Sequence, residues 1–494
     1  MLYNVINISQ FEVLMKKIIS ALLLSILLVS NVSYVSFAEN ETATATSSED
    51  SKNEKNNRIK SKETKKPSPT PKPSSTPKAK ETEDVKAESA QKESDDPNIL
   101  SESAFLIDAS TGKVIYEKNA DKKMFPASTT KIMTAYLAIK NLDLDTQLIA
   151  SKTAVDIPLD SSKMALVEGE ILSVYDLLNA LLVHSANDAA NVLAEAVSGS
   201  NEEFVALMNK TASDLGMTNT NFENPHGYHD DNHYTTARDM AIIARLAMEN
   251  PVFAEMVAAK RMEIQPTNKC PEVRTYTTRN MLINKYASVK IKYSYATGIK
   301  TGHTDKAGQC LVASASRNDL DLISVVFKAP KNVADRVYMD TINLFEYAYT
   351  NFRAKVVLKA DDLASVCKVR WASGSSSLVL KTNRDVKPLL PKQNYNPELL
   401  TNEINLYENI TAPIKQGDEL GEVKYFYDGE EVISSKLYAT HDVSRSFIKQ
   451  ILSYIFNIWF LLVFGIVVAA IILRRIKMLK RIKKKRRIER SYRR

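Results

Sequence analysis

The chain has 494 residues, 44% of them hydrophobic and 25% charged, and its formal net charge at pH 7 is +8. This length leaves room for two or three domains with sizeable cores. Thirteen Lys or Arg residues and a single acid lie in residues 474–494, whereas residues 39–473 carry a net charge of −5. The basic character therefore belongs to the tail, and the charge does not predict nucleic-acid binding.

The first predicted element is a secretory signal peptide in residues 1–38. A basic pair at residues 16–17 precedes an uncharged apolar run, and Ser36 and Ala38 are small residues where a signal peptidase cleaves. The basic pair follows Met15 directly, so Met15 is an alternative true start. We expect the rest of the chain to be exported.

Residues 39–98 are predicted to form a disordered linker. They contain no aromatic residue, and Lys, Glu, Ser, Thr and Pro dominate the composition. Such a segment cannot bury enough apolar surface to offset the entropy cost of folding. We interpret it as a tether or spacer.

A folded domain is predicted over residues 99–353. It opens with two short strands, residues 104–108 and 113–117, on either side of a turn that contains Gly112. This hairpin leads directly to a stretch rich in hydroxyl groups.

The stretch FPASTTKIMTAYLAIK, residues 125–140, predicts a helix that begins near Ser128. Its Ser and Thr hydroxyls are good capping groups, which is one explanation of the pattern. The other explanation is chemical, because Ser128 and Lys131 are three residues apart on one helix face. A lysine whose pKa is lowered by burial or by nearby positive charge can take the serine proton and make the serine nucleophilic.

Ser185 and Asn187 form an S-x-N motif between two helical runs, and Asp188 is a candidate cap of the second helix. Ordinary capping at a helix junction would explain this motif when it is considered alone. The motif is also short enough to occur by chance, so its meaning depends on what surrounds it.

A K-T-G motif occupies residues 300–302 on a predicted strand at residues 298–301. Residues 310–316 and 320–327 predict the two strands that follow. Lys300 alone would be an ordinary solvated strand lysine. The three motifs together in one exported domain favour a catalytic explanation.

Residues 354–440 are predicted to form a small all-β domain. Asp428-Gly429 is typical of a hairpin turn. Short β-type runs recur at residues 356–358, 377–381, 423–427 and 432–437.

Residues 451–473 predict a transmembrane helix. The run contains no charged residue, and 23 residues at about 1.5 Å each can cross the roughly 30 Å hydrocarbon layer. The positive-inside rule then places the tail at residues 474–494 in the cytoplasm and the domains before the helix outside. We therefore expect a single-pass protein of the cell membrane with an extracytoplasmic catalytic domain.

The order and spacing of the three motifs resemble the penicillin-recognising serine enzymes. The stretches PASTTKIMTAY, LLVHSANDAANVLAE, NPHGYHDDNHYTTARDMA and IKTGHTDKAGQCLVASA resemble, within that group, the D-alanyl-D-alanine carboxypeptidase family of low-molecular-mass penicillin-binding proteins. The resemblance covers roughly residues 99–350 in detail. It extends to residues 355–440 only through their β-rich character and their place in the chain.

The resemblance implies an α+β fold, a β-lactamase/transpeptidase-like helix-sheet-helix sandwich with a mostly antiparallel sheet. It implies peptidoglycan stem peptides as substrates, β-lactam antibiotics as inhibitors, and no cofactor or metal. Ser128 would attack the carbonyl between two D-alanines, Lys131 would take its proton, and Ser185 would relay a proton to the leaving amine. Asn187 would hold the substrate amide.

The K-T-G strand would supply the substrate-binding residues Lys300, Thr301, Gly302 and His303. Lys300 would keep Lys131 neutral and, with Thr301, meet the terminal carboxylate. The backbone N–H groups of Ser128 and His303 would form the oxyanion hole.

A zinc-dependent peptidase is one alternative. His226, His229 and His233 have ligand-like spacing, but Pro225 and Gly227 argue against a helix that would bring them together. The cysteines show no C-x-x-C spacing and predict neither a disulfide pair nor a metal site; they are Cys270, Cys310 and Cys367.

A membrane-anchored penicillin sensor without turnover is the second alternative, although a tail of 21 residues is a poor signalling domain. A β-lactamase would differ in substrate rather than in mechanism. No E-x-x-L-N motif lies between Asn187 and Lys300, so a glutamate that drives penicillin deacylation has no candidate. We expect a long-lived penicilloyl enzyme.

Overall fold

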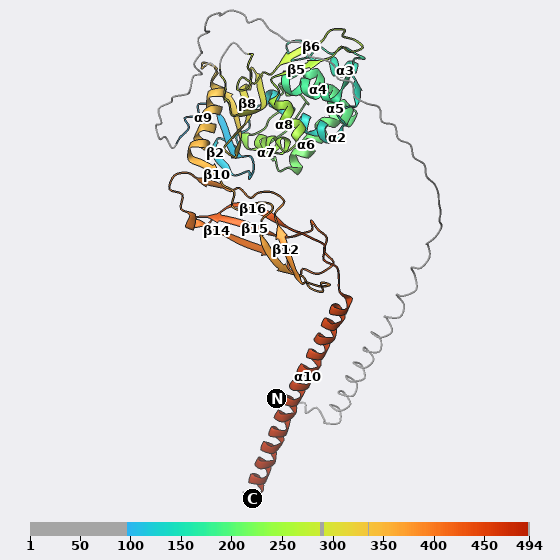
Figure 1. Cartoon of the computed structure of the whole chain (residues 1–494), viewed down its shortest axis with the longest axis vertical. Helices are drawn as coiled ribbons and strands as arrows, with labels where there is room; N and C mark the ends of the chain where they lie inside the picture. Colours follow the sequence, from blue (N-terminus) through green and yellow to red (C-terminus); the bar gives the residue numbers. More distant parts are fainter. Residues whose placement is uncertain (1–95, 287–290, 334, 493–494) are drawn as a thin grey trace, which may run out of the picture. The chain divides into compact units, whose positions relative to one another are not determined.

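The computed structural model of the chain describes residues 96–286, 291–333 and 335–492, with side chains described as far as residue 484 (Figure 1). The predicted signal peptide, the alternative start at Met15 and nearly all of the predicted linker lie outside these residues. Three parts follow in chain order: a region of helices and strands, a region of strands, and one long C-terminal helix.

The first part is built on a five-stranded antiparallel sheet with the strand order β2-β1-β9-β8-β7. Its strands are β1 (Ser103–Asp108), β2 (Val114–Lys118), β7 (Ala296–Thr304), β8 (Gly308–Arg317) and β9 (Leu320–Ala329). The strands β8 and β9 are buried over most of their length because both faces of the sheet are covered. All five strands predicted for this region are present.

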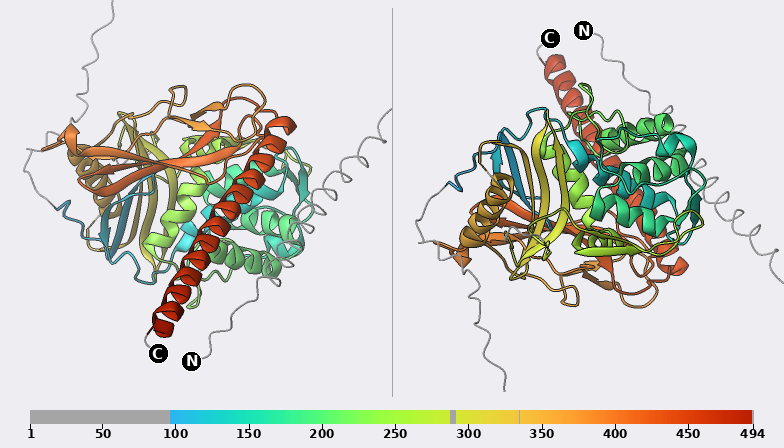
Figure 2. Two further views of the ribbon diagram at one scale, coloured as in Figure 1. Left: turned by 90° about the horizontal axis from the view of Figure 1, so that it is seen from below. Right: turned by 90° about the horizontal axis from the view of Figure 1, so that it is seen from above.

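Alternating side chains of the sheet enter two separate cores. On β9, Ile323 and Val325 belong to the core shared with the helices α2 (Lys131–Asn141), α5 (Asn187–Ser198), α7 (Ala237–Met248) and α8 (Pro251–Ala258). Leu322 and Val326 belong to the core beneath α9 (Arg336–Asn351). Figure 2 shows α9 on one side of the sheet and the other helices on the opposite side. This is the helix-sheet-helix sandwich that the resemblance implied.

The helices of this part, in chain order, are α2 (Lys131–Asn141), α3 (Lys152–Val155), α4 (Val174–Asn179), α5 (Asn187–Ser198), α6 (Asn201–Asp214), α7 (Ala237–Met248), α8 (Pro251–Ala258) and α9 (Arg336–Asn351). Two small sheets complete it, β3 (Gln147–Ile149) with β4 (Ile171–Ser173) and β5 (Arg261–Ile264) with β6 (Arg274–Thr277).

The second part is a five-stranded antiparallel sheet with the order β11-β12-β16-β15-β14 and a core of its own. Asp428 and Gly429 have φ values of 52° and 81°, which suit the tight turn between β15 and β16, so the predicted hairpin is confirmed. The predicted strand at residues 356–358 is absent, because within it only Leu358 forms a bridge, an isolated one to Val386.

The strand β10 pairs with β13 in a separate two-stranded sheet. The strands of the second part are β10 (Phe352–Ala354), β11 (Ser365–Lys368), β12 (Ser377–Lys381), β13 (Leu389–Pro391), β14 (Leu400–Leu406), β15 (Glu419–Tyr427) and β16 (Glu430–Ala439).

The third part is a single helix, α10 (Phe447–Tyr492). Its section Phe447–Lys484 is long and apolar enough to cross a membrane, with a mean hydropathy of 2.8 in its most apolar window. The helix begins before the predicted span at residues 451–473 and continues into the basic tail. The sequence showed the apolar run but not that the helix would extend through the charged residues.

Candidate active site

The predicted nucleophile lies at the start of a helix, as its sequence indicated. A 3₁₀ turn at Ala127–Thr130 leads into α2, and within the described residues no side chain caps this helix start. The Thr129 hydroxyl donates to the Pro126 carbonyl at 2.7 Å, and Thr130 Oγ1 lies 2.8 Å from a ring nitrogen of His233. Ser128 Oγ lies 3.0 Å from Lys131 Nζ. The capping explanation of these hydroxyls is therefore wrong.

Lys131 is completely buried and its amine has three oxygen neighbours. Nζ lies 3.0 Å from Ser128 Oγ, 2.7 Å from Asn187 Oδ1 and 2.6 Å from the His226 carbonyl oxygen. Burial, and then the positive charges of Lys300 and Arg279, lower the pKa of Lys131 well below its ordinary value.

The contacts of Lys131 also orient its lone pair. The carbonyl oxygens of Asn187 and His226 can only accept hydrogen bonds, so a neutral amine donates its two N–H groups to them. Its lone pair then faces the third neighbour, the Ser128 hydroxyl, which can donate. The geometry suits proton transfer from Ser128 to Lys131.

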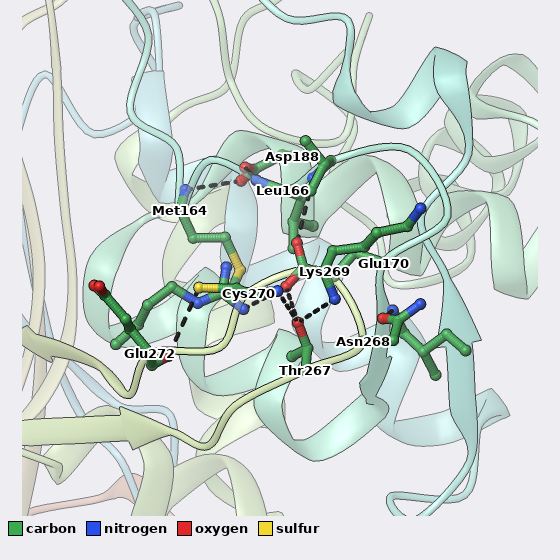
Figure 3. A network of polar contacts seen from close by, with 12 residues as sticks. Met164, Leu166, Glu170, Asp188, Thr267, Asn268, Lys269, Cys270 and Glu272 are labelled. Atoms are coloured by element: carbon green, nitrogen blue, oxygen red, sulfur yellow. Dashed lines mark hydrogen bonds and ion pairs between the residues drawn. The ribbon is translucent and has the colours of Figure 1, made fainter.

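The S-A-N motif lies between the short helix η2 (Ala180–His184) and α5, at the predicted helix junction. Ser185 adopts the left-handed backbone conformation, with φ 71° and ψ 34°. The N-cap of α5 is Ala186, so the prediction that Asp188 caps this helix is wrong. Asp188 is buried and its carboxylate accepts the N–H groups of Met164 at 3.1 Å and Leu166 at 3.0 Å (Figure 3).

The segment that holds Asp188 is itself held by the hairpin of β5 and β6. Glu170 is fully buried and pairs with Arg274 at 2.6 Å, while the Thr267 hydroxyl donates to the same carboxylate at 2.8 Å (Figure 3). Asn268 Nδ2 donates to the Gly169 carbonyl at 2.8 Å. This network joins the hairpin to residues 164–170 and, through Asp188, to the S-A-N turn.

Lys300 forms the opposite wall of the site. It is 2% exposed, and its Nζ donates to Ser185 Oγ and to the Thr301 carbonyl, both at 3.0 Å. Burial, and then the charge of Arg279, lower the pKa of Lys300 to about 7. Lys300 is therefore not a solvated strand lysine.

Gly302 lets strand β7 pass closely against Ser128. A Cβ at this position would lie 2.9 Å from the Pro126 carbonyl oxygen and 3.2 Å from the Ser128 nitrogen. β7 is an edge strand, and the Thr301 carbonyl accepts a hydrogen bond from the Lys300 amine. Alternation places the backbone N–H of His303 on the same side, near the Ser128 backbone.

Two groups at the site were missed by sequence reasoning. The His226 carbonyl accepts a hydrogen bond from Lys131, and a backbone group carries no residue-type signal. Arg279 follows β6, and its charge lowers the pKa of both Lys131 and Lys300. Its position depends on the hairpin fold, which no motif in the sequence predicts.

The three histidines of the zinc alternative do not converge. Burial lowers the pKa of His226 to about 3 and that of His233 to about 4. Across the described residues, no group of three His, Cys, Asp or Glu side chains could hold a metal ion. The rings contact separate partners: the Tyr228 N–H for His226, Asp231 for His229 and Thr130 for His233.

Comparisons with known proteins identify the family of the chain. Residues 89–331 match the family model described as D-alanyl-D-alanine carboxypeptidase, and residues 352–445 match that of the penicillin-binding protein 5 C-terminal domain. The chain is 32% identical to the D-alanyl-D-alanine carboxypeptidase DacF of Bacillus subtilis over 70% of this chain and 86% of the relative. It is 30% identical to the carboxypeptidase DacA of Escherichia coli over 74% of this chain and 90% of the relative.

A solved structure of penicillin-binding protein 5 from Haemophilus influenzae is 32% identical and has a TM-score of 0.58. The match covers 71% of this chain and 99% of that protein. The architecture, the geometry around Ser128 and these matches lead to one conclusion: the chain belongs to the D-alanyl-D-alanine carboxypeptidase family, whose members include low-molecular-mass penicillin-binding proteins.

Proposed function

We propose that Ser128 is the nucleophile of a serine-type D-alanyl-D-alanine carboxypeptidase that removes the terminal D-alanine from peptidoglycan stem peptides. The observation that carries this proposal is the buried Lys131 amine, with two acceptors for its N–H groups and its third neighbour, the Ser128 hydroxyl, at 3.0 Å. Lys131 takes the Ser128 proton while Ser128 Oγ attacks the peptide carbonyl. The family match supports this reaction.

The tetrahedral intermediate needs hydrogen-bond donors for its oxyanion. The backbone N–H groups of Ser128 and His303 are the candidates, because Gly302 allows β7 to approach the 3₁₀ turn that contains Ser128. One such donor is worth about 3 to 4 kcal/mol in a serine protease. Ser185, hydrogen bonded to Lys300, then relays to the leaving D-alanine amine the proton that Lys131 took from Ser128, and Asn187 holds the substrate amide.

The terminal carboxylate binds at the positive wall of the site. Lys300 supplies an ammonium, Thr301 supplies a hydroxyl on the same strand, and Arg279 adds a second cation. Water hydrolyses the resulting acyl-enzyme and completes turnover. A β-lactam acylates the same serine, and we propose that its acyl-enzyme is long-lived.

Labelled penicillin tests the nucleophile assignment. It should attach covalently to the wild-type protein and not to Ser128→Ala, and free D-alanine should appear only with the wild type. Labelling of the mutant at the wild-type rate would contradict the assignment. Covalent labelling without D-alanine release would instead support the penicillin sensor. Loss of activity in EDTA that zinc restores would show a metal-dependent reaction and contradict the serine mechanism.

We propose that residues 99–353 form the catalytic domain, that residues 354–440 form the β-rich domain, and that α10 anchors both to the cell membrane. The apolar section of α10 and the basic tail after Leu473 support a single-pass topology with the catalytic domain outside. Protease added to intact protoplasts should digest the domain around Ser128 and spare a C-terminal epitope. Digestion of that epitope from outside would refute the orientation.

A further inference from the structure

The loop of residues 222–235 supplies one of the two acceptors that orient the Lys131 amine. This acceptor is the His226 carbonyl, whose oxygen lies 2.6 Å from Nζ. If that carbonyl turned away, a neutral amine would be free to donate an N–H to Ser128 Oγ, and its lone pair would no longer face the hydroxyl proton. The direction of proton transfer therefore depends on what holds this loop in place.

Two hydroxyl groups of the nucleophile helix hold the loop. Thr134 on α2 is fully buried, and its hydroxyl donates to the Pro225 carbonyl, one residue before His226. A threonine inside a helix commonly donates to a carbonyl of its own preceding turn, but this one bonds to a distant segment. Thr130, four residues earlier, is also fully buried, and its Oγ1 lies 2.8 Å from His233 Nε2.

The contacts of His233 fix its tautomer. Its ring is 2% exposed, and Nδ1 accepts the Glu223 N–H at 3.1 Å, so Nε2 carries the ring proton. Nε2 therefore donates to Thr130 Oγ1. One neutral imidazole thus joins the beginning and the end of the loop to the turn that carries the nucleophile.

The middle of the loop packs directly on the same turn. A Cβ added to Gly227 would lie 1.9 Å from the Ala127 carbonyl oxygen, so the two backbones are in close contact. The Gly227 N–H also donates to Asn224 Oδ1 at 2.7 Å. The peptide group that presents the His226 carbonyl is therefore held from both sides.

We propose that Thr134 and His233 are positioning residues for the base Lys131. By holding the loop before and after His226, they keep the lone pair of Lys131 directed at the Ser128 hydroxyl. This inference rests on the proposed function, because it concerns the step in which the Ser128 proton moves to Lys131 while Ser128 Oγ bonds to the carbonyl carbon.

The expected effect falls on the acylation step and not on binding. Removing a general base altogether costs about 10²- to 10⁴-fold in rate. Thr134→Val leaves Lys131 in place and removes only its support, and a misplacement of about 1 Å can cost about 100-fold. We therefore expect the acylation rate at saturating penicillin to fall by about ten- to 100-fold, with an unchanged half-saturating concentration.

Acylation of the full-length protein in detergent by a fluorescent penicillin tests the proposal, because rates over a range of concentrations separate these two quantities. Thr134→Val has nearly the shape of the native side chain but no donor, so it should lower the saturated rate alone. Thr134→Ser restores the donor and should restore the rate.

His233→Phe and Thr130→Val remove the second link from its two sides, and each should also lower the saturated rate. The double variant should be no slower than the slower single variant, since both changes break the same hydrogen bond. Losses that multiply in the double variant would show that the two residues do not act through this bond and would overturn the role of His233.

Thr341→Val is the matched control. Thr341 is a fully buried threonine on α9, across the sheet from α2, and its hydroxyl donates to the Val337 carbonyl at 2.8 Å (Figure 2). This variant should lower the melting temperature as Thr134→Val does, and it should be acylated at the wild-type rate.

An equal loss of rate in Thr341→Val, or a wild-type rate in both Thr134→Val and His233→Phe, would overturn the proposal and leave the carboxypeptidase assignment intact. Absence of penicillin labelling in the wild type would instead refute the proposed function.

Discussion

Replacing Lys300 tests how much its positive charge contributes to kcat/KM, separately from the contribution of Ser128. The amine is 2% exposed, and its contacts are neutral oxygens of Ser185 and Thr301. In the proposed mechanism it makes a charge-assisted hydrogen bond to the substrate carboxylate, worth about 1.5 to 3 kcal/mol. Lys300→Ala should therefore lower kcat/KM for a free-acid peptide by about ten- to 150-fold.

A second effect acts in the same direction. The charge of Lys300 helps to lower the pKa of Lys131, so its removal raises that pKa and leaves less of the neutral base at a given pH. Lys300→Arg keeps a positive charge but presents a planar group of different reach, and its activity should be intermediate. Thermal melting should show that both variants fold.

The assay compares D-alanine release from a peptide with a free C-terminal carboxylate and release of the terminal residue from its amidated analogue. The wild type should favour the acid, and Lys300→Ala should lose most of this preference. Turnover of the acid by Lys300→Ala near the wild-type level, or equal use of acid and amide by the wild type, would refute the role of the K-T-G lysine.

Two further predictions concern the network and the base. Glu170→Ala leaves Arg274 without its partner in a buried site. It should lower the free energy of unfolding by about 3 to 5 kcal/mol in denaturant melts and slow penicillin acylation. A loss below about 1 kcal/mol would contradict a buried pair. Acylation by penicillin should accelerate with rising pH as Lys131 loses its proton. Arg279→Gln removes a positive charge that lowers the pKa of Lys131, so it should move this limb of the pH-rate profile to higher pH. An unchanged limb would show that Arg279 does not affect the pKa of Lys131.

Local features of the site could be predicted from the sequence. The spacing of Ser128 and Lys131 within one helical turn is a local property, and so is the helix junction at Ser185. The sheet order around β7 followed from consecutive strands joined by short turns. These features depend on neighbours in the chain, which a single sequence displays.

Long-range features could not be predicted. The His226 carbonyl reaches Lys131 across 95 residues, and Arg279 depends on how the hairpin of β5 and β6 folds onto residues 164–170. Asp188 has the residue type of a helix cap, yet tertiary structure gives its carboxylate two backbone donors from another segment. Residue type alone cannot distinguish these uses, because each one depends on packing between distant segments.

In the proposed single-pass topology, the continuity of α10 would determine how deeply the protein lies in the bilayer. Its uncharged run ends at Leu473, and Arg474 and Arg475 follow within the same helix. Drawing one of these charges to the middle of the hydrocarbon costs about 2.5 to 3.5 kcal/mol, so the helix resists being pulled outward. In that topology the length of the apolar run would set the height at which the first residues of α10 leave the membrane. Lengthening the apolar run by one helical turn would raise the first residues of α10 by about 5.4 Å. The length of residues 451–473 would therefore set the distance between the membrane and the folded domains.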